Sequence, residues 1–180
     1  TVADRPWHPD SLPTWDFDPA ESRRLLASLG FRDANGDSIL DDAKGHRVSF
    51  TLMYNSDNNT RKAMAELIQS DLRKVGVDVI PQGVEFKALT SHLDGDYEYE
   101  ACLLGQSTSV PPDPGIGGTF WMSSGRMHYW WAKQKQPGLP VDQRLDELFR
   151  QAGAAVPLAE RKRASDEMQR LINDECLLIW

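Results

Sequence analysis

The residues with the clearest chemical potential lie in the acidic stretch DANGDSILDD, which begins at Asp33. Asp33, Asn35 and Asp37 occupy positions 1, 3 and 5 of a calcium-binding loop, where oxygen ligands are needed. The rest of the pattern does not fit, because Ser38 replaces the glycine of the sharp turn and Lys44 replaces the bidentate glutamate. We therefore predict a turn braced by aspartate side chains and no bound metal. A calcium-stabilised adhesion or scaffold module is the alternative function.

Patterns typical of catalysis are few. The four histidines are scattered along the chain without the spacing of metal ligands. The sequence SSG at residues 123–125 lacks the G-x-S-x-G pattern of a nucleophile elbow, and GIGG at residues 115–118 follows a proline and opens no phosphate loop. We predict that the chain is not an enzyme and needs no cofactor. A hydrolase that uses the loop serines is a third hypothesis.

The segment of residues 105–142 contains the best candidates for ligand contact. It has no helical or strand period, and connections of this length usually carry function or are disordered. Its aromatic residues are too apolar to remain in water, which disfavours disorder. They are Phe120, Trp121, Tyr129, Trp130 and Trp131. Aromatic residues on a loop either cap a core or form a stacking surface for a ligand, and both interpretations are open.

Composition limits the possible partners. The chain has 180 residues, 40% of them hydrophobic, which is enough for one globular domain or one lobe of a larger protein. The formal net charge of −7 argues against a nucleic-acid partner, which would need a concentrated basic face. Cys102 and Cys176 both lie in apolar runs, so we expect buried free thiols rather than a disulfide.

The spacing of apolar residues predicts alternating strands and helices. Strands are expected over residues 46–54, 77–80 and 99–105, and helices over residues 18–30, 59–75, 86–95, 142–152 and 157–172. Asp18 is the expected N-cap of the first helix and Asp142 that of the fourth, and Glu21 can close a capping box. The alternation predicts an α/β fold. The final run CLLIW is typical of a strand cut short, so we expect a piece of a longer protein.

The order of several segments resembles a known family. YNSDNNTRKAMAELIQSDLRKVGVDVIPQGVEFKAL and the upstream FDPAESRRLLASLGFRDANGDSILDDAKGHRVSFTLMY resemble the family 5 extracellular solute-binding proteins of ABC importers, the dipeptide/oligopeptide-binding type. EACLLGQS, the DP step, FWMSSG and PLAERKRASDEMQRLINDECLLIW follow in the same order. The resemblance covers nearly the whole chain. No single motif is very specific, and the strength lies in the order of the segments.

The resemblance implies a periplasmic-binding-protein-like lobe with a mixed sheet flanked by helices. Residues 1–180 would be a single lobe, most of the second, C-terminal lobe of a two-lobed receptor, with residues 105–142 as a long loop facing the cleft. The implied partners are a small-molecule solute, a membrane permease and the first lobe of the parent chain. The implied location is periplasmic or extracellular, and the protein would associate with the membrane through the transporter.

The site residues implied by the resemblance lie after the third expected strand. In peptide-binding members an acidic residue shortly after this strand holds the ammonium group of the ligand. The matching positions here are amide and hydroxyl residues, and the next acid is Asp113, so sugars or opine-like solutes become as plausible as peptides. The expected ligand-binding residues are Gln106, Ser107, Ser109, Asp113, Phe120, Trp121, Tyr129 and Trp130.

Overall fold

The computed structural model of the chain describes residues 7–107, 112–154 and 157–179. They form two compact units. The sheet unit comprises residues 16–105, and the helical unit combines the N-terminal segment, residues 7–15, with the described residues after 105. Each unit has a hydrophobic core of its own. No helix of the described residues is long and apolar enough to cross a membrane.

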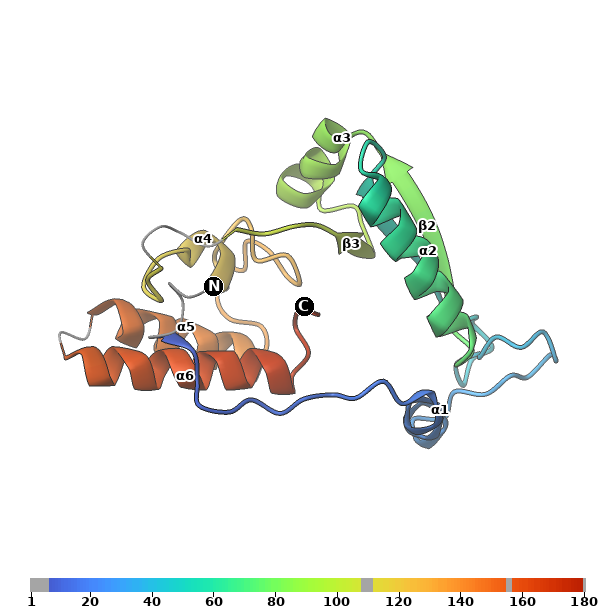
Figure 1. The fold of residues 1–180 in the computed structure, drawn as a ribbon, viewed down its shortest axis with the longest axis horizontal. Helices are drawn as coiled ribbons and strands as arrows, with labels where there is room; N and C mark the ends of the chain where they lie inside the picture. The colour runs from blue at the N-terminus through green and yellow to red at the C-terminus, as the bar shows by residue number, and fades with distance from the viewer. Residues whose placement is uncertain (1–6, 108–111, 155–156, 180) are drawn as a thin grey trace. The chain divides into compact units, whose positions relative to one another are not determined.

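Three parallel strands form the sheet (Figure 1). β1 (Ser49–Asn55) lies in the centre, between β2 (Asp78–Val84) and β3 (Ala101–Leu103). The predicted α/β class is confirmed. The antiparallel pairing of a mixed sheet occurs, among the described residues, only as two isolated bridges that Asp41 makes with Arg32 and Arg47. β2 is longer than expected because an edge strand tolerates the missing N–H of Pro81.

The helices of the sheet unit begin where the sequence predicts. They are α1 (Pro19–Ser28), α2 (Asn59–Arg73) and α3 (Phe86–Ser91), the last continuing into the π-helical turn η2 (His92–Asp96). The carboxylate of Asp18 accepts hydrogen bonds from the amides of Ala20 and Glu21 and so caps α1 as predicted. The capping box does not form, since Glu21 pairs with Arg24 instead.

The core of the sheet unit lies between α2 and one face of the sheet. Leu52, Tyr54 and Val79 meet Ala65, the residue on which the buried face of α2 is centred. The apolar faces predicted for the helices were partly wrong, because Met64 and Leu67 of α2, Leu25 of α1 and the α1 C-cap Leu29 are exposed. The strict alternation predicted along β1 also fails at Met53, which is buried because this central strand contacts both α2 and α3.

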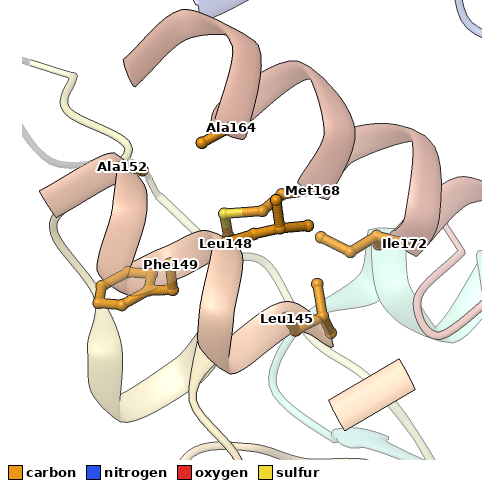
Figure 2. Close-up of a cluster of buried hydrophobic side chains, with 7 residues drawn as sticks. All are labelled: Leu145, Leu148, Phe149, Ala152, Ala164, Met168 and Ile172. Atoms are coloured by element: carbon orange, nitrogen blue, oxygen red, sulfur yellow. The ribbon is translucent and has the colours of Figure 1, made fainter. Parts of the chain in front are cut away.

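The helical unit is built on two long helices. α5 (Pro140–Ala154) and α6 (Leu158–Asp174) pack side by side, and the short helix α4 (Gly118–Trp121) contacts α5. Figure 2 shows the buried residues between α5 and α6, which include all the apolar positions predicted for the two helices except Leu171 at the edge. They are Leu145, Leu148, Phe149, Ala152, Ala164, Met168 and Ile172.

The C-terminal apolar run is not a strand over its described residues, 176–179. Cys176 has a φ of 49° and its preceding helix ends at Asp174, so the chain turns there instead of extending. Ile179 is 95% exposed. The expectation of two buried thiols was also wrong for Cys176, which is exposed. Cys102 is partly buried in β3, and burial raises the pKa of its thiol to about 11.

Replacement of Gly76 by alanine should destabilise the sheet unit more than the same change at Gly36. Both glycines have left-handed φ values, 85° and 83°. A β-carbon at position 76 would lie 2.6 Å from Leu40 Cγ, whereas one at position 36 would have no heavy atom within 4 Å. We expect Gly76→Ala to lower the free energy of unfolding by roughly 2–4 kcal/mol and Gly36→Ala by about 1–2 kcal/mol. Urea denaturation measures both, and equal losses would contradict the steric account.

Candidate functional site

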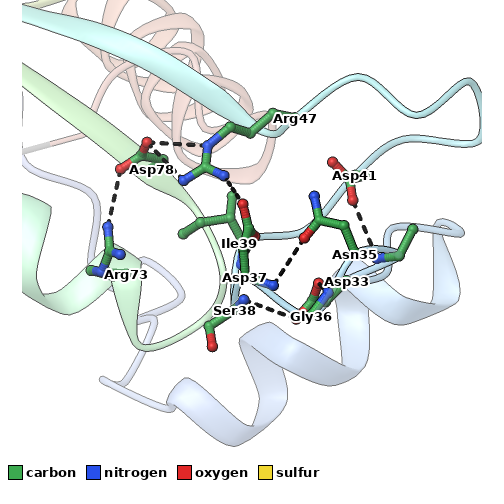
Figure 3. A network of polar contacts seen from close by, with 11 residues as sticks. Asp33, Asn35, Gly36, Asp37, Ser38, Ile39, Asp41, Arg47, Arg73 and Asp78 are labelled. Carbon is green, nitrogen blue, oxygen red and sulfur yellow. Dashed lines mark hydrogen bonds and ion pairs between the residues drawn. The ribbon is translucent and has the colours of Figure 1, made fainter.

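The acidic stretch after α1 is braced by its own side chains (Figure 3). Asp33 accepts hydrogen bonds from the amides of Gly36 at 2.7 Å and Ser38 at 2.9 Å. The side-chain oxygen of Asn35 accepts from the Asp37 amide at 2.9 Å. These are the local side-chain bonds that stabilise turns. The predicted use of the acidic residues as turn braces is confirmed.

Arg47 supplies the positive charge of this turn. Its guanidinium forms ion pairs with Asp37 and with Asp78, the latter at 3.2 Å. The amide of Ile39 and the Arg47 guanidinium together hold the pKa of Asp37 below its usual value, against the opposing effect of burial. Within the described residues, no group of three or more His, Cys, Asp or Glu side chains is arranged to hold a metal ion. The carboxylates that would ligate calcium are thus engaged by amides and a guanidinium.

A fully buried carboxylate, Asp142, binds side chains of residues 128–134. Asp142 contacts His128 Nε2 at 3.1 Å and accepts hydrogen bonds from Trp130 Nε1 at 3.0 Å and Gln134 Nε2 at 2.8 Å. The prediction that Asp142 is the N-cap of its helix was wrong. The helix begins earlier, at Pro140, whose fixed φ suits a first turn, and the Asp142 side chain serves the loop instead.

His128 joins this carboxylate to α4. Its Nδ1 lies 3.0 Å from the Phe120 carbonyl oxygen, while its Nε2 faces Asp142. Both partners are acceptors, so both contacts are hydrogen bonds when the imidazole carries two protons. The ring also lies against Trp130, with centroids 3.7 Å apart. We call Asp142, His128, Trp130 and Gln134 the buried hub. Through His128, the hub fixes the position of Phe120 and of the helix turn that contains it.

Asp142 stays ionised because of these partners. Burial alone would raise the pKa of this carboxyl group, but the hydrogen bonds from Trp130, Gln134 and His128 outweigh burial and lower it. A buried carboxylate is stable only while such donors remain in place. The conformation of the loop and the charge of Asp142 consequently depend on each other.

A cavity of about 620 Å³ lies within the helical unit. The N-terminal segment, the loop around α4 and one face of α6 form its wall. Phe120 and Trp121 lie edge to face in that wall, with ring centroids 4.8 Å apart. Cavities of this size and largely apolar lining are typical of small-molecule sites.

Five of the residues predicted from the sequence line the cavity, namely Gln106, Ser107, Asp113, Phe120 and Trp121. Ser109 lies outside the described residues. Tyr129 and Trp130 are not part of the lining. Tyr129 supports Phe120 edge to face at 5.5 Å, and Trp130 packs against the core of α5 and α6.

The sequence reasoning missed the contribution of α6 to the cavity. Ser165, Gln169 and Asn173 line it at intervals of four residues, next to Met168 and Ile172. This spacing forms a polar stripe along one face of a predicted helix, so the signal was present in the sequence.

The N-terminal segment was also missed, because side chains of α6 hold it by its backbone. Gln169 Nε2 donates to the Trp7 carbonyl at 2.6 Å, Lys162 Nζ to the His8 carbonyl at 3.0 Å, and Asn173 Nδ2 to the Pro13 carbonyl at 3.2 Å. Every residue has a backbone carbonyl, so the sequence does not show which carbonyl a side chain will bind. This segment closes one side of the cavity with Trp7, His8 and Leu12.

Two side chains with chemical potential in this unit are already paired. Asp113 accepts from the Gly115 amide at 2.8 Å and forms an ion pair with Arg161, whose hydrogen bond lowers the pKa of the carboxyl group. Ser123 is buried, and its hydroxyl donates to Asp146 at 3.0 Å. A serine that donates to a carboxylate in the interior has no access to a substrate carbonyl, which argues against Ser123 as the nucleophile of a hydrolase.

The fold is that of periplasmic binding proteins. The oligopeptide-binding protein AppA from Bacillus subtilis, solved with a nonapeptide, matches 94% of this chain with 32% of its own, at 26% identity and a TM-score of 0.78. MelB from Agrobacterium fabrum, solved with stachyose, matches 91% of this chain with 25% of its own, at 18% identity and the same TM-score, a likeness of fold alone.

The family follows from the sequence comparison. Residues 2–128 match the bacterial extracellular solute-binding proteins, family 5 (middle region), and the chain belongs to this family. A probable ABC transporter-binding protein of Deinococcus radiodurans is 29% identical over 179 residues, covering 91% of this chain and 29% of the relative. AppA of Bacillus subtilis is 30% identical over 162 residues, covering 89% of this chain and 27% of AppA. The chain thus spans less than a third of these relatives, which are solute receptors and not enzymes.

Replacement of Asp142 by asparagine should destabilise the helical unit. An asparagine would present an NH₂ group to side chains that donate, and it removes the charge that His128 faces. We expect a loss of about 2–4 kcal/mol in the free energy of unfolding, against about 0.5 kcal/mol for Glu147→Gln on the same helix, which removes only an exposed ion pair. Chemical denaturation followed by tryptophan fluorescence measures both, and similar losses would contradict the role of the hub.

The difference in unfolding free energy between the native chain and Asp142→Asn should depend on pH. The folded-state pKa of Asp142 lies below its unfolded value, so its stabilising effect is present above the unfolded pKa of about 3.9 and is lost as pH falls through the folded pKa. Below about pH 5, we expect the difference in unfolding free energy to shrink as the pH falls towards about 2. A difference that grew on acidification would refute this sign.

Proposed function

We propose that this chain forms most of the second lobe of a two-lobed, substrate-binding component of an ABC importer. The observation that carries the proposal is that five of the eight predicted ligand residues line one cavity in a chain of the solute-binding family. The loop of residues 105–142 would face the cleft and present this cavity to the solute. The lobe would act with the first lobe of the parent chain and with a membrane permease, in the periplasm or outside the cell.

Capture in this scheme is non-covalent. Apolar and aromatic surface around Phe120 and Trp121 would provide burial, and neutral amides and hydroxyls such as Gln106 and Ser107 would direct the solute. Closure of the two lobes about a hinge would complete the desolvation, as in other periplasmic binding proteins. The chain alone offers one wall of the site, so it should bind a solute weakly. Tight binding by the chain alone would contradict the two-lobed scheme.

A peptide is the preferred solute. AppA is an oligopeptide-binding protein, and its structure holds a nonapeptide. A sugar or an opine-like solute is the second class, favoured by the amide and hydroxyl groups in the wall. Mass spectrometry of the small molecules released from the gently purified full-length receptor distinguishes the two classes. Peptide masses support the preferred solute, glycan masses the second class, and the absence of any bound solute after repeated preparation counts against a solute receptor.

Trp121 should contribute more to solute affinity than Trp131. Trp121 lines the cavity, whereas Trp131 is 50% exposed and lies outside the lining. We expect Trp121→Ala in the full-length receptor to weaken binding of the co-purified solute by about tenfold or more and Trp131→Ala by less than about twofold. Calorimetric titration measures the dissociation constants, and circular dichroism checks that both variants fold. Equal affinities of the two variants would exclude Trp121 from the site.

A further inference from the structure

The charge of the cavity wall depends on a single carboxylate. Asp113 is the only acidic residue among the described lining residues, and none of those residues is lysine or arginine. The other polar groups are neutral amides and hydroxyls, from Gln106, Ser107, Thr119, Ser165, Gln169 and Asn173. His8, the other titratable group, contacts the Pro9 carbonyl through Nδ1 at 2.9 Å. When a group of the solute enters the cavity, the charge that it meets is therefore set by Asp113 and by the side chain that neutralises this carboxylate.

Arg161 compensates Asp113 from outside the lining. Its Nη2 forms the ion pair with the carboxylate, while its Nε donates to the Ala152 carbonyl at 2.8 Å. Its guanidinium carbon also lies 5.3 Å from the centre of the Trp7 ring, a cation–π contact. Trp7 is fixed in turn by a hydrogen bond from its Nε1 to the Pro112 carbonyl at 2.9 Å. The guanidinium is thus held next to Asp113 by two further contacts, with the Ala152 carbonyl and the Trp7 ring.

Arg161 balances the charge of the Asp113 carboxylate by contact with one of its two oxygens. The oxygen that Arg161 contacts, Oδ1, also accepts the Gly115 amide. A permanently charged guanidinium next to that oxygen repels a second cation. A cationic group in the cavity would lose its water and gain only a carboxylate whose charge Arg161 already balances, which is costly. A neutral apolar group would gain from burial against Phe120, Trp121 and Met168.

We propose that Arg161 determines the charge preference of the cavity, so that the cavity takes a neutral, mainly apolar group of the solute and rejects an ammonium group. The inference rests on the proposed function, because it assumes that the cavity contacts the solute. For a peptide solute, the group is the side chain of an aliphatic or aromatic residue. Arg161 acts as a positioning and specificity residue through Asp113, without itself lining the cavity.

The test uses the full-length receptor and peptides that differ only by an ammonium group. Norleucine and lysine are placed in turn at each position of one nonapeptide with constant termini, and dissociation constants are measured by calorimetry. The native receptor should bind the norleucine form about tenfold more tightly than the lysine form at the position that enters the cavity, the scale of one charge-assisted hydrogen bond. Arg161→Gln frees the carboxylate of Asp113 and should remove or reverse this ratio.

Three further variants separate charge from damage to the fold. Arg161→Lys keeps the positive charge and should retain the native ratio, and the double variant Asp113→Asn with Arg161→Gln should restore it because the wall is neutral again. Asp113→Asn alone leaves the cation of Arg161 unpaired and should favour a glutamate peptide over its glutamine counterpart by about tenfold. This variant tests the inference independently if Arg161→Gln does not fold.

The outcomes distinguish this inference from the proposed function. If folded Arg161→Gln binds the norleucine peptides with the native norleucine-to-lysine ratio at every position, the inference is overturned while the receptor function stands. If Asp113→Asn shows no preference for glutamate, the inference is equally overturned. If the native receptor binds no peptide of the series and releases no bound solute, the proposed function fails and the inference fails with it.

Discussion

The buried carboxylate of Asp142 is the interaction on which the helical unit depends. A charge taken out of water needs every one of its partners, and here the partners come from three points of one loop, His128, Trp130 and Gln134. Gln134 is itself held by the Gly138 amide, which donates to its Oε1 at 2.6 Å. These contacts hold together the part of the loop from His128 to Gly138, and His128 connects it to Phe120 in the aromatic wall of the cavity.

Carboxylates have the same role elsewhere in the chain. Asp146 accepts from both the amide and the hydroxyl of Ser123 and pairs with Arg150, so it fixes the turn after α4. In the sheet unit, Asp33 and Asp37 hold the chain between α1 and β1. An excess of acidic residues could suggest metal binding or a highly charged surface. In this protein many of them are instead internal acceptors for irregular backbone, which lacks the hydrogen-bond ladder of helices and strands.

The sequence predicted elements that are determined locally and missed those determined by distant partners. The cap at Asp18 and the core positions of α5 and α6 follow from neighbours within a few residues, so capping chemistry and helical period were sufficient. Aspartate is a residue type that often caps a helix, but the Asp142 side chain contacts His128, Trp130 and Gln134 of the preceding loop. Rules based on the nearest neighbours in sequence do not predict these contacts. The exposed Leu25 and Leu29 illustrate the same limit, because an apolar period shows which residues share a face and not what covers it.

The attachment of the N-terminal segment to α6 has a consequence for sequence variation. The donors Lys162, Gln169 and Asn173 all bind main-chain carbonyls, which every amino acid possesses. Exchanges at His8 or Pro13 therefore leave an acceptor in place, whereas exchanges at the donors remove the bond. Mutational tolerance should be unequal on the two sides of this contact, so the segment can drift in composition and alter the rim of the cavity while its attachment is retained.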